Sequence, residues 1–191
     1  MTTHYIDIRL LPDPEFSPAH LWRALYAKLH RALVQQAISS VGVSFPQYQL
    51  RSQSLGQVLR LHGHATPLEQ FMATDWLKGM YDHVDITPVG LVPSQAQHRI
   101  VQRRQFKTSA ERLRRRRMQR KGETAEQAAI AIPSHVERNP RLPYVQLRSN
   151  SSGQSFYLWI ELGPLHETPV PGSFNTYGLG QADRGASIPW F

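Results

Sequence analysis

The residues of this sequence that could do chemistry are few in kind. The chain has nine histidines and no cysteine, and it contains no paired-carboxylate motif, glycine-rich phosphate loop or G-x-S-x-G sequence. His30 lies on a predicted helix, about 140° around the axis from Leu25 in the middle of the apolar stripe, at the edge of the buried face or beyond it. A histidine there changes charge near neutral pH and can act as a general base. Exposed helical histidines are also common without any role, so His30 alone decides nothing.

A metal site is the second chemical possibility. His62 and His64 flank Gly63 in a predicted strand, which would place two imidazoles on one face. Metal centres need further protein ligands, and no acidic residue or histidine stands at the spacing of a third one. We therefore expect neither a metal ion nor another cofactor.

The most distinctive stretch of the chain is residues 99–121. It holds eleven of the 22 lysines and arginines and a single acidic residue, Glu111. Residues 1–98 carry seven basic and seven acidic side chains, whereas residues 99–191 carry 15 basic and seven acidic ones, so the formal net charge of +8 lies entirely in the second half. This asymmetry favours a polyanionic partner, most often nucleic acid.

Part of the basic stretch is predicted to form a helix with one basic face. Thr108-x-x-Glu111 is a capping box, so the helix would begin there. Helical periodicity then gathers five side chains on one face: Arg112, Arg115, Arg116, Gln119 and Arg120. The apolar seam is thin, so such a helix gains little from packing and would be ordered best by phosphates. The alternatives are a solvated basic face or a disordered basic segment.

The elements that must hold these residues indicate an α+β fold. Ser17-Pro18 is predicted to cap the first helix, and Thr66-x-x-Glu69 the second. The N-terminal half follows the order β-α-β-β-α-β, with strands at 6–10, 42–45, 57–64 and 84–91 and helices at 18–37 and from residue 66 onward. This is the ferredoxin-like arrangement, which hosts many functions and so says little alone.

The C-terminal half is predicted to be a second domain, reached through a linker at residues 93–98. Gly122 would end the arginine helix, and Thr124-x-x-Gln127 would begin an alanine-rich helix that stops before Pro133. Alternation at residues 145–147 and 156–162 predicts a β-hairpin with a serine-rich tip. The apolar end at residues 188–191 is expected to pack. The two predicted domains are residues 1–93 and 94–191.

Composition also restricts the compartment. Without cysteine there is no disulfide, and the alternating N-terminus lacks the charged start and apolar run of a signal peptide. No apolar run approaches the roughly 20 residues of a membrane span. We expect a cytoplasmic protein with no membrane partner.

Seven short segments, spread over nearly the whole chain, carry a family resemblance when taken in order. They are HYIDIRLLPDPEF at 4–16, KLHRALV at 28–34, VGVSFP at 41–46, AERLRRRRMQR at 110–120, LRSNSSGQSF at 147–156, YGLG at 177–180 and the terminal PWF. With these segments the chain resembles the CRISPR repeat-processing endoribonucleases of type I-F systems. The basic stretch alone would not support this resemblance.

The resemblance implies an enzyme that binds the stem-loop of a CRISPR repeat RNA and cuts at the 3′ base of the stem without metal. The RNA's own 2′-hydroxyl would attack and leave a 2′,3′-cyclic phosphate. By motif, His30 in the first domain would be the catalytic histidine, and Ser149 would hold the attacking hydroxyl. Ser151 would be a neighbouring active-site serine, and Tyr177 would help to place the histidine. The product would stay bound within a surveillance complex that contains other subunits.

The resemblance also implies how the second domain binds RNA. Arg103 and Gln105 would read bases at the foot of the stem, and Phe156 would stack on its last base pair. The groove-lining arginines would be Arg115, Arg116 and Arg120, whereas Gln119 departs from a pattern that has arginine there. Because Phe156 alternates with Leu158 and Ile160, it could instead be an ordinary core residue.

Two other classes of function stay open. One is a catalytically silent subunit that binds an RNA hairpin within a larger complex. The other is a basic assembly protein that binds nucleic acid without sequence preference. The set His30, Ser149 and Tyr177 favours the enzyme over the silent subunit. Arg103, Gln105 and Phe156 together favour specific binding over unspecific binding.

Overall fold

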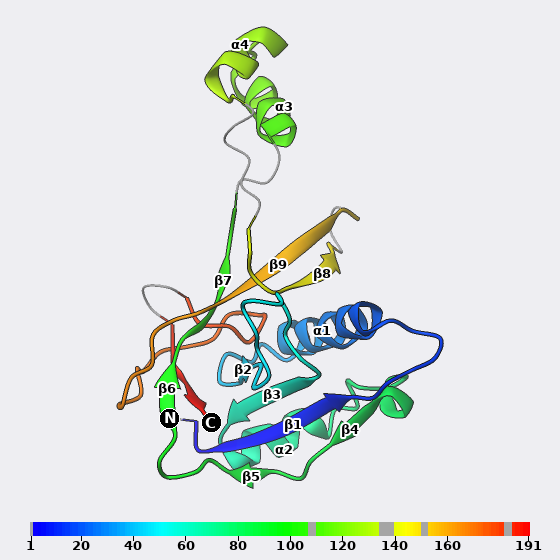
Figure 1. The fold of residues 1–191 in the computed structure, drawn as a ribbon, viewed down its shortest axis with the longest axis vertical. Coiled ribbons are helices and arrows are strands. Elements are labelled where there is room, and N and C mark those ends of the chain that lie inside the picture. The colour runs from blue at the N-terminus through cyan, green and yellow to red at the C-terminus, as the bar shows by residue number, and fades with distance from the viewer. Residues whose placement is uncertain (1, 107–109, 134–139, 150–152, 182–184) are drawn as a thin grey trace. The chain divides into compact units, whose positions relative to one another are not determined.

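A computed structural model of the chain describes residues 2–106, 110–133, 140–149, 153–181 and 185–191 (Figure 1). It is a mixed α+β structure built on antiparallel sheets, as predicted. The chain divides into two compact units, one of Met1–Arg104 with Leu142–Phe191 and one of Gln105–Arg141. This division differs from the predicted boundary after residue 93, because residues 94–104 and the C-terminal segment belong to the first unit.

The main sheet of the first unit has the strand order β2-β3-β1-β4, and β5 also pairs with β1. Ile6 lies opposite Leu61 and Ile8 opposite Leu59, so the apolar side chains of the central strands are in register in the core. The predicted strands are confirmed, the last one as two short pieces. Their bounds are β1 His4–Leu10, β2 Gly42–Ser44, β3 Val58–Gly63, β4 Val84–Ile86 and β5 Gly90–Leu91.

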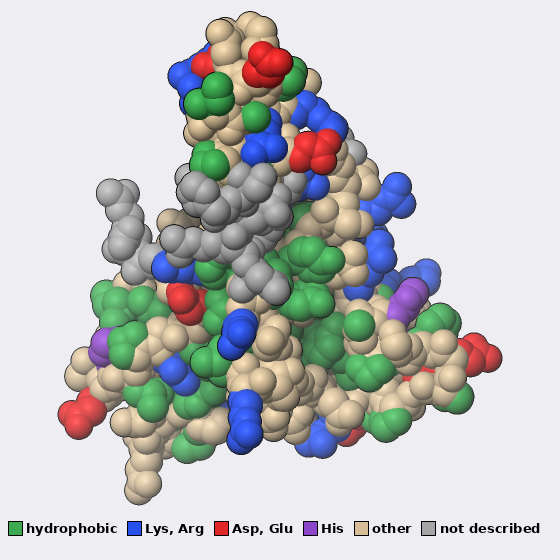
Figure 2. Space-filling model, turned by 45° about the horizontal axis from the view of Figure 1, so that its top comes forward, with side chains coloured by type: hydrophobic (Ala, Val, Ile, Leu, Met, Phe, Trp, Pro, Cys, Tyr) green, Lys and Arg blue, Asp and Glu red, His purple; other side chains and the backbone are tan. Residues whose placement is uncertain are grey.

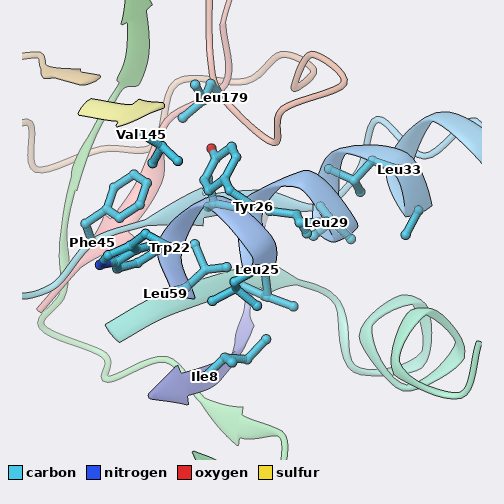
Figure 3. Close-up of a cluster of buried hydrophobic side chains, with 14 of the residues drawn as sticks. Ile8, Trp22, Leu25, Tyr26, Leu29, Leu33, Phe45, Leu59, Val145 and Leu179 are labelled. Atoms are coloured by element: carbon cyan, nitrogen blue, oxygen red, sulfur yellow. The ribbon is translucent and has the colours of Figure 1, made fainter. Parts of the chain in front are cut away.

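The first helix, α1 (Pro18–Gln35), joins this sheet to the rest of the unit. The Ser17 side chain accepts a hydrogen bond from the His20 amide at 3.3 Å, which confirms the predicted cap with Pro18 as first helical residue. Figure 3 shows the buried stripe: Leu25 lies near Ile8 and Leu59, and Trp22 packs beside Phe45. The opposite side of α1 is left for polar residues.

The second helix, α2 (Ala65–Met72), begins earlier than predicted. Its N-cap is His64, whose side chain makes no capping hydrogen bond, so the predicted capping box at Thr66 is wrong. Pro67 falls in the first turn, where a missing amide hydrogen costs nothing. Leu68 and Phe71 are buried as predicted, and Trp76 is buried beyond the end of the helix. A short 3₁₀ turn, η1 (Tyr81–His83), leads into β4.

Part of the predicted linker is a strand. β6 (Gln97–Arg99) pairs antiparallel with β10 (Ile188–Trp190) near the C-terminus, and Figure 1 shows the two side by side. Residues 97–98 were therefore predicted wrongly, because their pairing partner lies about 90 residues further along the chain, beyond the reach of local patterns. The packing of the terminal residues is confirmed, since Ile188 is buried.

The predicted hairpin forms two strands of a three-stranded sheet with the strand order β7-β9-β8. It consists of β7 (Val101–Arg104), β8 (Tyr144–Arg148) and β9 (Ser155–Leu162), with Leu147 opposite Phe156. Inward side chains of the hairpin, among them Val145 and Leu158, belong to the same core as α1, and β8 packs against that helix. This packing places the hairpin next to the polar side of α1.

The second unit holds α3 (Ala110–Lys121) and α4 (Ala125–Ala131). Gly122 ends α3 with a φ of +67°, a conformation that favours glycine. The predicted capping box of α4 is confirmed, because Thr124 and Gln127 exchange side-chain and backbone hydrogen bonds. The other predicted box begins at Thr108, which lies outside the described residues. No helix in the described part of the chain is long and apolar enough to cross a membrane.

A buried ion pair ties the chain's last residue to the main sheet. The Arg60 guanidinium donates to both carboxylate oxygens of Asp7, at 2.6 and 2.8 Å, and to the Phe191 carbonyl oxygen at 3.0 Å. The rings of Tyr5 and Phe191 lie 4.6 and 4.0 Å from the guanidinium carbon. Arg60 therefore holds β1, β3 and the C-terminus together.

We predict that Arg60→Ala lowers the free energy of unfolding by about 3–5 kcal/mol, because it leaves the Asp7 carboxylate partly buried and unpaired. Urea denaturation measures the change. Arg9→Ala, at an exposed position of β1, is the matched control and should stay within about 0.5 kcal/mol of wild type. Equal stability of the two variants would contradict this role of Arg60.

Candidate active site and nucleic-acid interface

His30 lies on the polar side of α1 and is half-buried. Its Nδ1 atom is 2.7 Å from the carbonyl oxygen of Thr176. A carbonyl oxygen only accepts hydrogen bonds, so Nδ1 must carry the hydrogen. In the neutral ring, Nε2 then keeps its lone pair and can accept a proton.

Tyr177, which follows Thr176, covers one face of the imidazole. The two rings are nearly parallel, at 6°, with centroids 4.1 Å apart. Stacking and the hydrogen bond at Nδ1 together restrain both the tilt and the rotation of the His30 ring. The predicted proximity of His30 and Tyr177 is thus present in the structure.

The loop that carries Thr176 and Tyr177 is held from both sides. Within the loop, the Asn175 side-chain oxygen accepts hydrogen bonds from the amides of Tyr177 and Leu179, at 2.8 and 3.2 Å. From α1, the Tyr26 hydroxyl donates to the Tyr177 carbonyl oxygen at 2.9 Å. Burial raises the pKa of Tyr26 well above its usual value, so this hydroxyl remains a donor.

Gly178 completes the loop in a way that needs glycine. Its φ is +70°, and a Cβ atom there would lie 2.7 Å from Cγ1 of Val43. The Gly178 carbonyl oxygen also accepts a hydrogen bond from the Val43 amide at 2.8 Å. The loop is therefore fixed to β2 as well as to α1.

His30 opens into a cavity of about 290 Å³ between α1 and the hairpin. Four of the residues singled out from the sequence line this cavity, namely His30, Ser149, Phe156 and Tyr177. The other lining residues are Ala27, Arg31, Leu147 and Arg148. Segments from three distant parts of the chain thus converge on one space. Ser151, the remaining catalytic candidate, lies outside the described residues.

Ser149 stands where the hairpin tip begins. Its amide donates to the Gln154 carbonyl oxygen at 2.9 Å, and its own carbonyl oxygen accepts from the Gly153 amide at 2.8 Å. The Arg148 side chain donates to the Gly153 carbonyl oxygen at 2.9 Å. These contacts fix the backbone that presents Ser149 to the cavity.

Phe156 is half-buried and lines the cavity, so it is not a fully enclosed core side chain. It nonetheless packs against the core, so its position fits both predicted roles, stacking on a base pair and packing in the core. The Arg103 guanidinium lies 5.4 Å from the centre of the Phe156 ring and 5.7 Å from that of Tyr177. The predicted RNA contacts Arg103 and Phe156 are therefore neighbours beside the cavity.

The second unit carries the basic face predicted for α3. All five side chains of that face are exposed, namely Arg112, Arg115, Arg116, Gln119 and Arg120. On the other side, Arg114 donates to the Ile132 carbonyl oxygen at 2.8 Å, and Arg117 pairs with both carboxylate oxygens of Glu123. Hydrogen bonding to Arg117 lowers the pKa of Glu123.

These inner contacts orient α3, so its arginines have two distinct uses. Inward ones join α3 to the segment around α4, and outward ones present charge at the surface of this unit, where Figure 2 shows many Lys and Arg side chains. Arg115 also reaches Glu111 one turn earlier, at 3.0 Å. Gln105, the first residue of this unit, is exposed.

The two histidines considered for a metal site are not paired on one strand. His62 is fully buried in β3, with Nε2 2.8 Å from the Ser44 hydroxyl oxygen. His64 lies beyond the end of β3, where its Nδ1 atom is 3.3 Å from the Thr3 hydroxyl oxygen. Among the residues that the structure describes, no three His, Asp or Glu side chains form a metal-binding group.

Sequence reasoning missed several residues that line the cavity or support it. Ala27 lies one turn of α1 before His30, and Arg31 lies one turn after Ala27, so helical spacing indicates both. Thr176 acts through a backbone carbonyl, which no side-chain pattern can reveal. The Tyr26 hydroxyl was hidden because its position fits the apolar stripe.

Comparison with known proteins gives the family. A family model described as "CRISPR-associated protein (Cas_Csy4)" matches residues 5–191. The chain belongs to this family. The chain is also similar to the "CRISPR-associated endonuclease Cas6/Csy4" of Pseudomonas aeruginosa (strain UCBPP-PA14), which is 46% identical over 188 residues, 98% of this chain and 99% of the relative. A protein with the same name from Escherichia coli (strain UTI89 / UPEC) is 42% identical, with the same coverage. The family resemblance found in the sequence is confirmed.

Stability should depend on pH through His62. Burial, and next the charge of Arg60, lowers the pKa of His62 to about 3. An unfolded histidine has a pKa of about 6.5, so below that pH His62 is protonated in the unfolded chain but stays neutral in the folded chain. The stabilisation is complete above pH 6.5 and is lost as pH falls toward 3.

We predict that wild type loses about 2 kcal/mol of unfolding free energy through this residue between pH 7 and pH 5. Urea denaturation at both pH values measures the loss. His62→Gln keeps a hydrogen-bonding group near Ser44 but cannot titrate. Between pH 7 and pH 5 the variant should therefore lose about 2 kcal/mol less unfolding free energy than wild type. Identical pH dependence in both proteins would contradict the buried neutral state of His62.

Proposed function

We propose that this chain is an endoribonuclease that processes CRISPR precursor RNA in the cytoplasm, cutting at the 3′ base of the repeat hairpin. The observation that carries the proposal is the cavity in which His30, Ser149, Phe156 and Tyr177 meet. The two relatives named as CRISPR-associated endonucleases support the same class of activity. The family resemblance assigns roles to these residues, and the geometry is compatible with each role.

In the proposed reaction, Nε2 of His30 removes the proton from the 2′-hydroxyl next to the scissile phosphate. The 2′-oxygen attacks phosphorus, the bond to the 5′-oxygen breaks, and a 2′,3′-cyclic phosphate remains on the upstream RNA. The departing 5′-oxygen takes up a proton and becomes a hydroxyl. General-base catalysis of this kind contributes about 10²–10⁴ in rate.

The surroundings of His30 suit a base. The hydrogen bond from Nδ1 to the Thr176 carbonyl oxygen leaves Nε2 as the ring nitrogen that can take the proton. Ser149, and Ser151 beside it in sequence, would hold the ribose by hydrogen bonds. Tyr177 would keep the imidazole in line with the attacking oxygen. Because the nucleophile belongs to the RNA and the base to the protein, we propose that the reaction needs no metal ion.

Binding would combine phosphate contacts with local reading of bases. We propose that the exposed face of α3 (Arg112, Arg115, Arg116, Gln119 and Arg120) contacts phosphates of the stem, because side chains read bases poorly in the narrow major groove of A-form RNA. Arg103 and Gln105 would hydrogen-bond to base edges at the foot of the stem, and Phe156 would stack on the last base pair. Glutamine at position 119 removes one charge from the array.

Two finer assignments belong to the same proposal. The strand order β2-β3-β1-β4 with α1 and α2 supports a ferredoxin-like arrangement of the N-terminal part. We further propose that the protein keeps the processed RNA and joins other subunits of a type I-F surveillance complex. An RNA-binding subunit without catalysis is the second candidate, and the restrained imidazole of His30 favours the enzyme over it.

Replacing the base tests the function directly. His30→Ala should slow hairpin cleavage by at least about 10²–10⁴-fold, while the dissociation constant for an uncut hairpin stays nearly unchanged. Single-turnover cleavage and filter binding give the two quantities. His166→Ala, an exposed histidine of the same unit, is the control and should cut at the wild-type rate. Normal cleavage by His30→Ala would remove this residue from the mechanism.

The role of α3 can be measured through salt. If its outer face neutralises phosphates, the plot of log affinity against log salt concentration has a slope of about −0.7 to −0.9 per contact. Replacing Arg115 and Arg116 together by alanine should reduce the steepness by about 1.4 to 1.8. The double variant Arg9→Ala/Arg51→Ala, at exposed positions of the first unit, serves as a charge-matched control. An unchanged slope in the α3 variant would assign RNA binding to another surface.

A further inference from the structure

A second and larger cavity adjoins the candidate active site in the first unit. Its volume is about 740 Å³, and it lies between the start of α1, the loop before β3 and the outer strand β8. We call it the α1–β8 groove, lined by Ser17, Pro18, Ala19, His20, Trp22, Arg23, Ser52, Gln53, Ser54, Leu55, Gly56, Tyr144, Val145 and Gln146.

The groove and the active-site cavity follow the same two elements. On α1, His20 and Arg23 line the groove, and Ala27 and His30 line the cavity, a spacing that keeps all four on one helix face. On β8, the groove wall ends at Gln146 and the cavity wall begins at Leu147. Ten helical residues separate His20 from His30, so the two spaces together extend for about 15 Å along α1.

The chemistry of this path suits an anion. No aspartate or glutamate occurs among the described residues that line either space, whereas Arg23, Arg31 and Arg148 do. The first turn of α1 also lacks an acidic residue, so no carboxylate in that turn offsets the positive end of the helix dipole. Negative charge is therefore favoured from the start of α1 up to His30.

The groove also offers groups for bases and sugars. Trp22 belongs to the lining but is buried, and its indole nitrogen donates to the Gly56 carbonyl oxygen at 2.8 Å, so it supports the groove without presenting its ring. The side chains of Ser52 and Gln53 are exposed on the loop before β3. Tyr144, on β8, packs edge-on against the Tyr157 and Trp159 rings, with centroids 4.9 and 4.6 Å away, and its 43% exposed remainder is accessible to an unpaired base. Arginine, aromatic and short polar side chains together are typical of sites for single-stranded nucleic acid.

We propose that the α1–β8 groove binds the single-stranded RNA that immediately follows the cut. The inference rests on the proposed function, which puts the scissile phosphate at His30. Phe156 would close the cavity against the last base pair, so the strand beyond the phosphate must leave by another side. The groove has walls next to those of the cavity on both α1 and β8, and no acidic side chain is among the described residues that line it. Contacts in the groove hold the downstream strand until the bond between phosphorus and the 5′-oxygen breaks. After that step the downstream strand is no longer joined to the stem.

Two hairpin RNAs test this assignment: a short one that ends a single nucleotide after the cut, and a long one that continues as single strand. Both carry deoxyribose at the attacking position, so they bind without being cut. Wild-type protein should bind the long RNA more tightly, with a salt slope steeper by about 0.7 for each additional phosphate. Arg23→Ala should weaken binding of the long RNA about tenfold and leave the short RNA unaffected.

Three further variants make the test specific. Arg23→Lys keeps the charge and should recover most of the lost affinity, and Tyr144→Ala, on the opposite wall, should also weaken only the long RNA. Arg9→Ala on β1 should change neither dissociation constant. Thermal melting establishes that each variant is folded.

The possible results separate this inference from the proposed function. If wild type fails to cleave the ribose form of the short RNA, the proposed function fails. If the short RNA is cleaved but Arg23→Ala and Tyr144→Ala bind both RNAs like wild type, the groove does not bind the downstream strand. A third RNA is a hairpin extended only on its 5′ side. If Arg23→Ala weakens binding of this RNA instead of the long RNA, the inference is likewise overturned.

Discussion

The hydrogen bond between His30 Nδ1 and the Thr176 carbonyl oxygen is the contact on which the candidate site depends. It joins residues 146 positions apart in the chain, and with the Tyr177 stack it restrains the imidazole and leaves Nε2 as the nitrogen that can accept a proton. A freely rotating histidine would expose either nitrogen, and a base must be aligned with the proton that it removes. The rest of the first unit can be understood as the framework that brings this carbonyl to α1.

That framework is made largely by the C-terminal segment. Gly42 allows Phe174 and Ile188 to lie against β2, where an added Cβ atom would come within 2.5 Å of the Phe174 ring and 2.8 Å of the Ile188 side chain. β10 pairs with β6, and Arg60 binds the last carbonyl oxygen. The loop before β10 is thus held by the same core that positions α1, and the geometry of the candidate site becomes a consequence of core packing.

Local patterns predicted the elements well where each element forms its own signature. The cap and apolar stripe of α1, the hairpin alternation and the exposed basic face of α3 all follow from periods of 3.6 or 2 residues. The same patterns failed at β6, where the pairing strand lies far along the chain. They also failed at the start of α2, because Thr66 is not the cap and Pro67 occupies the first turn of the helix. His30 and Ser149 were found through motifs of the family, yet the contact that orients His30 comes from a backbone carbonyl and could not be read from side-chain types. The α1–β8 groove was missed because Arg23 and Tyr144 become neighbours of one space only after the hairpin packs on α1.

One measurement tests the central claim that a protein base and the RNA's own hydroxyl suffice for the reaction. Wild-type protein is incubated with a repeat hairpin RNA in excess EDTA, and the products are sized and their ends analysed. The account predicts a single cut at the 3′ base of the stem, with a 2′,3′-cyclic phosphate on the upstream product and no cut when the attacking ribose is 2′-deoxy. Cleavage that requires added Mg²⁺, or that proceeds on the 2′-deoxy RNA, would contradict it.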